Sequence, residues 1–118
     1  MRRAAVLCLV AVATVGCAKR PDAIAPVSIP MAAYSNLSCK GLQQEYRNEY
    51  ATLAAVSKAQ NEAATGDAVG VFLLGVPMSS TFGGDKAGDV GVSKGKIVAL
   101  EANMTSKNCA IPPKAPAA

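Results

Sequence analysis

The sequence predicts a mainly α-helical fold, in which two helices form an antiparallel hairpin clamped by a disulfide bond. Apolar residues recur three and four positions apart in two segments, about residues 38–64 and about residues 86–107, and this spacing is typical of amphipathic helices. Cys39 stands at the start of the first segment, and Cys109 lies just beyond the second. An antiparallel hairpin brings these two cysteines to the same end, within reach of a disulfide bond.

The first predicted helix begins after Ser38, because serine often caps helix N-termini. Its apolar face consists of Cys39, Leu42, Tyr46, Tyr50, Leu53, Val56 and Ala63. Gln60 interrupts this face, and Thr65, Gly66 and Asp67 are expected to end the helix.

The second predicted helix carries an apolar face and a stripe of small residues roughly opposite to it. The apolar face consists of Val90, Ile97, Leu100 and Met104, and the stripe of Gly84, Gly88, Gly91, Gly95, Ala99, Ala102 and Ser106. Such stripes allow a second backbone to approach closely. The alternative is that the small residues are incidental in a chain that is rich in Ala and Gly.

An uncharged apolar run, AVGVFLLGVPM, lies in the predicted connection between the helices, residues 68–82. It is too short to span a membrane, which takes roughly 20 apolar residues. It folds back onto the hairpin, enters a bilayer as a shallow element, or contacts a protein partner. The residues predicted to contact a membrane or partner are Val71, Phe72, Leu73, Leu74 and Val76.

The N-terminus has the pattern of an export signal, with Arg2 and Arg3 followed by an apolar stretch. The sequence Thr14-Val15-Gly16-Cys17 resembles the lipobox of bacterial lipoproteins. This resemblance implies that residues 1–16 are a lipoprotein signal peptide and that Cys17 becomes a lipidated N-terminus, with palmitate among its acyl chains. The alternative is an ordinary secretory peptide that leaves Cys17 as a spare thiol.

The predicted processing also bears on location and charge. Residue 18 is Ala rather than the Asp that retains many lipoproteins at the inner membrane, so the resemblance implies the periplasmic leaflet of the outer membrane, or the cell membrane if sorting differs. Loss of the two arginines lowers the formal net charge from +4 to +2. A chain with so little charge and no basic cluster is not expected to bind nucleic acid.

The four cysteines divide by position. Cys8 lies in the signal peptide and Cys17 takes the lipid, which leaves Cys39 and Cys109 for one structural disulfide in an oxidising compartment. The loop between them has about 70 residues, for which chain entropy predicts about 4 kcal/mol of stabilisation. Because histidine is absent and no C-x-x-C motif occurs, no metal site is predicted.

Proline-rich segments flank the predicted folded domain, residues 34–109. Residues 17–33 contain Pro21, Pro26 and Pro30 and predict an extended polyproline-like tether. Residues 110–118 have similar composition and predict a disordered tail.

The chain contains no convincing catalytic set. Ser93 and Lys96 match S-x-x-K formally, but the S-D-N and K-T-G motifs that accompany it in penicillin-recognising enzymes are absent. Without histidine, a nucleophile also lacks its commonest general base. We expect no enzymatic activity and no cofactor.

Short motifs across residues 34–109 resemble those of small uncharacterised proteobacterial and prophage-borne lipoproteins. The motifs are SC at Ser38, ATGDAV from Ala64, GGDK from Gly83, SKGK from Ser93 and SKNC from Ser106. The resemblance implies one folded unit and no known activity. The sequence thus predicts a membrane-anchored envelope lipoprotein, a structural or interaction module with a possible protein partner. The alternative is a membrane-active protein whose apolar segment, residues 68–78, inserts into a bilayer in a lysis, exclusion or pore-associated role.

Overall fold

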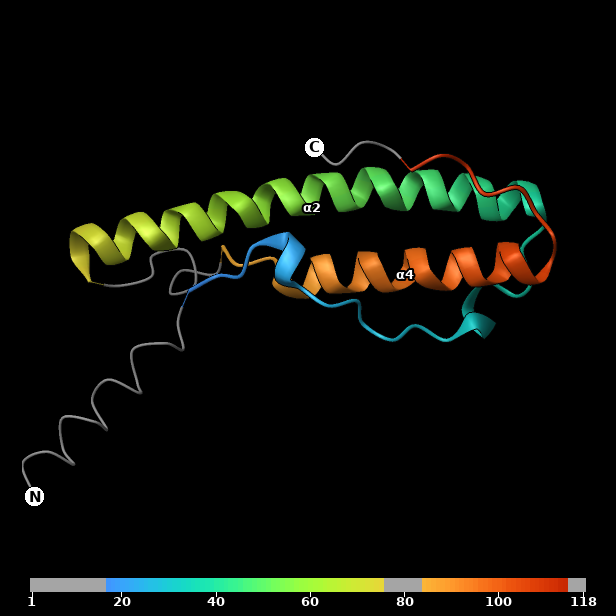
Figure 1. Cartoon of the computed structure of the whole chain (residues 1–118), viewed down its shortest axis with the longest axis horizontal. Helices are drawn as coiled ribbons and strands as arrows, with labels where there is room; N and C mark the ends of the chain where they lie inside the picture. The colour runs from blue at the N-terminus through green and yellow to red at the C-terminus, as the bar shows by residue number, and fades with distance from the viewer. Residues whose placement is uncertain (1–16, 76–83, 115–118) are drawn as a thin grey trace, which may run out of the picture.

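The computed structural model describes residues 17–75 and 84–114. These residues form two short 3₁₀ helices, η2 (Pro21–Ala23) and η3 (Met31–Tyr34), and two long helices, α2 (Cys39–Leu74) and α4 (Ala87–Ser106). The two long helices lie side by side and antiparallel, and the N-terminal segment runs along the other side of α4 (Figure 1). The described part of the chain is therefore the predicted helical hairpin with an added third layer.

The hairpin is held together by an apolar core near the cysteine end. Leu42 and Tyr46 of α2 pack with Ile97, Leu100 and Met104 of α4. All five side chains are at most 6% exposed. Burying a side chain of this size stabilises the fold by about 1.5–3 kcal/mol. The side chains packed around this cluster are Tyr34, Leu37, Tyr50, Leu53 and Cys109.

Helix α2 begins as predicted but continues ten residues beyond the predicted end. Ser38 is the N-cap, and its side chain accepts a hydrogen bond from the Gly41 amide. The predicted end near residue 64 is wrong, because Gly66 costs the helix only about 1 kcal/mol, an amount that packing overcomes. The helix ends instead at Gly75, whose φ of 73° lies in the left-handed region that glycine adopts most readily.

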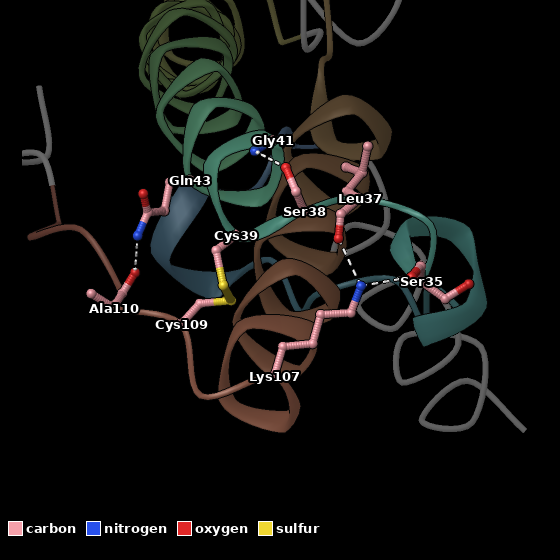
Figure 2. The surroundings of a disulfide bond; sticks show 9 residues. All are labelled: Ser35, Leu37, Ser38, Cys39, Gly41, Gln43, Lys107, Cys109 and Ala110. Atoms are coloured by element: carbon pink, nitrogen blue, oxygen red, sulfur yellow. Dashed lines mark hydrogen bonds between the residues drawn. A yellow bond between two sulfur atoms is a disulfide. The ribbon is translucent and has the colours of Figure 1, made fainter.

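The disulfide between Cys39 and Cys109 is confirmed. The two Cα atoms are 5.4 Å apart, and the bond joins the start of α2 to the chain just after α4 (Figure 2). Asn108, with a φ of 55°, turns the chain after α4, and the Cys109 amide donates to the Met104 carbonyl. This turn presents Cys109 to the first turn of α2.

The N-terminal segment is not a tether that stands away from the helices. It runs parallel to α4, and two α4 side chains and the C-cap Lys107 donate hydrogen bonds to its carbonyls: Lys94 to Pro21 and Ile24, Asn103 to Met31, and Lys107 to Ser35 and Leu37. Outside the short turns of η2 and η3, a proline-rich extended backbone makes few internal hydrogen bonds, so its carbonyls can accept from neighbouring side chains. Helix α4 supplies these donors, and for this reason the prediction of a free tether is wrong.

The start of the C-terminal segment also contacts the hairpin. The Gln43 side chain donates to the Ala110 carbonyl over 2.7 Å (Figure 2), and Lys114 lies 3.9 Å from Glu101. The predicted disordered tail therefore makes contacts up to residue 114. The rest of that prediction, residues 115–118, lies outside the described residues.

Reduction of the disulfide should destabilise the hairpin. The bond closes a loop with a sequence separation of 70, so we expect the free energy of unfolding to fall by about 4 kcal/mol. Urea unfolding of the oxidised and the reduced protein, followed by circular dichroism, measures this difference. An unchanged midpoint after reduction would contradict the assigned role of the bond.

Candidate functional site

The candidate site is the end of the hairpin remote from the disulfide, where the residues that follow Cys17 contact α2. Cys17 is exposed and its thiol is free. The next residue, Ala18, is only 8% exposed, and its amide donates to Oδ2 of the buried Asp67 over 2.7 Å. The chain is thus fixed to α2 one residue after the predicted lipidation position.

Two further side chains secure the same attachment. Gln60 is fully buried; its side-chain nitrogen donates to the Lys19 carbonyl over 2.7 Å, and its side-chain oxygen accepts from the Lys86 amide just before α4. Arg20 donates to the Thr65 hydroxyl over 3.2 Å. Gln60, which interrupts the apolar face in the sequence, therefore joins α2 to both the N-terminal segment and the start of α4.

Beyond this attachment, the last turns of α2 expose apolar side chains. The exposed fractions are 51% for Val69, 42% for Val71, 87% for Phe72 and 68% for Leu73. The sequence leaves three interpretations of this apolar run: it folds back onto the hairpin, enters a bilayer or contacts a partner. The exposure of these four side chains argues against the first. The remaining predicted contacts, the side chain of Leu74 and residue Val76, lie outside what the structure describes.

The small-residue stripe of α4 receives the N-terminal segment. The Val27 amide donates to the Gly91 carbonyl over 2.8 Å. A Cβ atom at Gly95 would lie 1.9 Å from the Val27 carbonyl oxygen, whereas one at Gly88 would meet nothing within 4 Å. Only the middle of the stripe is therefore a contact surface, and its occupant is an extended segment of the same chain rather than a helix.

The S-x-x-K residues take part in contacts within the fold. Ser93 donates to Glu49 over 2.6 Å, and Lys96 lies 3.5 Å from the other oxygen of the same carboxylate. Lys94 donates to the N-terminal segment. Ser93 and Lys96 therefore join α4 to α2, and Lys94 joins α4 to residues 21–24.

A buried tyrosine lies across the helix interface. Tyr46 is 1% exposed, donates to Glu101 over 2.9 Å, and stacks at a tilt against Tyr50, with ring centroids 4.8 Å apart. Burial, followed by the side chains of Tyr50 and Glu101, raises the pKa of Tyr46 well above its ordinary value. The hydroxyl therefore stays protonated at neutral pH and serves as a hydrogen-bond donor between the helices.

Among residues 17–75 and 84–114, no three His, Cys, Asp or Glu side chains lie close enough together to hold a metal ion. Within the same ranges, neither long helix is apolar over enough of its length to cross a membrane. Comparison of the chain with protein-family models, curated proteins and solved structures finds no match.

Two glycine substitutions in α4 should have opposite effects. Gly95→Ala should destabilise the fold by about 1–3 kcal/mol, because the added methyl group displaces the Val27 carbonyl. Gly88→Ala meets nothing and should stabilise α4 by up to about 1 kcal/mol. Urea unfolding measures both changes, and hydrogen exchange at the Val27 amide should accelerate in Gly95→Ala alone. Equal stabilisation by both substitutions would rule out the close contact.

Proposed function

We propose that this chain is a lipid-anchored protein of the bacterial cell envelope and acts as a non-enzymatic structural or interaction module. The lipobox-like sequence that ends at Cys17 carries the proposal. The exposure of the free Cys17 thiol supports it, because an acyl chain attached there would not disturb the packed residues that follow. Ser93 and Lys96, the possible catalytic pair in the sequence, both contact Glu49 across the two long helices, which fits a structural role.

The anchor is proposed to lie in the periplasmic leaflet of the outer membrane, or in the cell membrane if sorting differs. Two acyl chains hold a protein stably on a membrane, since each buried methylene contributes about 0.8 kcal/mol. The module then reaches from that surface into the periplasm, where an oxidising environment maintains the Cys39–Cys109 bond.

Substitution of Cys17 tests the anchor. In cells fed labelled palmitate, the wild-type chain should take up label and sediment with membranes, whereas Cys17→Ala should lose the label, because the thiol that accepts the lipid is gone. Cys8→Ala is the matched control and should keep both properties, since Cys8 lies in the predicted signal peptide. Labelled Cys17→Ala, or an unlabelled wild-type chain, would contradict the proposal.

The second candidate, a membrane-active protein, is favoured by the exposed apolar side chains at the end of α2. The helix continues only seven residues beyond Asp67, or about 10 Å, whereas the hydrocarbon core of a bilayer is about 30 Å thick. An apolar element of this length reaches into one leaflet of the bilayer.

We therefore expect the lipidated protein to release no trapped dye from vesicles of phosphatidylethanolamine and phosphatidylglycerol. Fluorescence of released dye measures this directly, and Leu73→Asp is the comparison variant because Leu73 is exposed. Release by the wild type that disappears in Leu73→Asp would support the membrane-active candidate instead.

A further inference from the structure

We propose that the exposed apolar end of α2, defined by Val69, Val71, Phe72 and Leu73, enters the same leaflet that holds the lipid on Cys17. The hairpin is then attached at two points and stands on the membrane with its disulfide end pointing away. The inference rests on the proposed lipidation of Cys17 and adds a second attachment and an orientation.

The two attachment points lie at the same end of the molecule. The Ala18 amide bonds to Asp67, only two residues before Val69, and the Lys19 carbonyl bonds to Gln60. Figure 1 shows the described chain starting beside the C-terminal half of α2, far from the end where the disulfide lies. A lipid on Cys17 would therefore hold the apolar end close to the membrane surface.

The distribution of the apolar side chains favours a bilayer over a protein groove. At about 100° per residue, Val71 and Leu73 lie on nearly opposite sides of α2, and Phe72 lies between them. A groove on a partner covers one side of a helix, whereas lipid surrounds it. The exposed side chains of Val69, Val71, Phe72 and Leu73 spread over about 200° of the helix circumference, with the buried Gly70 on the remaining side, and so wide an apolar surface suits the second environment.

The reach of the helix end matches a shallow insertion. From Asp67, beside Ala18, to Leu74 the helix rises about 10 Å. Interfacial elements bury their apolar side chains about 5–10 Å into the boundary between headgroups and acyl chains. With the lipidated residue at the surface, Phe72 and Leu73 would lie at about this depth.

Electrostatic attraction is not required for this contact. The charged side chains near the attachment have both signs: Lys19, Arg20 and Lys86 are accompanied by Asp22, Glu62 and Asp85. A mixed set of charges attracts anionic lipid weakly, so apolar burial is the driving force. The contact should therefore form equally on zwitterionic and anionic vesicles.

A tryptophan placed at the helix end tests the inference, because the chain contains no other tryptophan. Phe72 is 87% exposed, so Phe72→Trp should not disturb the fold; Ile111→Trp, at an exposed position near the disulfide, is the matched control. Each full chain is lipidated in a bacterial host and reconstituted in phosphatidylcholine vesicles, with or without phosphatidylglycerol. The phosphatidylcholine acyl chains are brominated to quench fluorescence.

We expect Phe72→Trp to emit at shorter wavelength and to lose most of its fluorescence to brominated lipid, in both vesicle types. Ile111→Trp should show neither change. The mass of the Cys17 peptide, measured on the same samples, separates the two proposals. An acylated chain on vesicles with unquenched Phe72→Trp overturns the second attachment alone, whereas an unacylated chain overturns both. A shifted but unquenched Phe72→Trp, in a chain that self-associates or retains a protein partner, also overturns the membrane contact.

Discussion

The close contact between the N-terminal segment and the glycines of α4 is the constraint on which the rest of the structure depends. Because Gly95 has no side chain, the Val27 carbonyl can lie against the helix backbone. This approach brings the segment close enough for Lys94, Asn103 and Lys107 to reach its carbonyls. It also carries Lys19 and Ala18 to Gln60 and Asp67, which join the far part of α2 to the rest of the hairpin.

Helix α4 serves two neighbours with two chemically different faces. Toward α2 it offers apolar side chains such as Leu100 and Met104, which exclude water. Toward the N-terminal segment it offers glycines and long polar side chains, which suit a backbone rich in proline. This division explains how a chain with only 4% aromatic residues builds a third layer: the contact with α4 uses hydrogen bonds to backbone carbonyls, and a small cluster of Ala18, Ala63 and Ala64 adds apolar burial against α2.

The sequence was sufficient to predict the hairpin and its clamp, because helical spacing and the position of two cysteines are local signals. It was not sufficient for the end of α2, since Gly66 and Asp67 favour termination locally and only the contact with Ala18 shows why the helix continues. The sequence also did not predict that the N-terminal segment packs against α4, because a proline-rich segment lacks the periodic apolar spacing that indicates a buried face. The glycines of α4 did signal a close approach, and the apolar residues Ile24, Val27 and Ile29 could have identified the occupant. At the candidate site, the sequence identified Cys17 and the apolar run, but their proximity follows only from the fold.

The order of these contacts along the chain constrains how the molecule assembles. The N-terminal segment is synthesised first, yet Lys94 and Lys107, to which it binds, lie about 70 residues later. Its binding surface on α4 therefore exists only after both helices have been made and paired. During that interval Ala18 and the carbonyls of the N-terminal segment lack the partners that cover them in the finished fold. Docking then buries Ala18 against Asp67, so the N-terminal segment, although it is made first, is the last layer to pack.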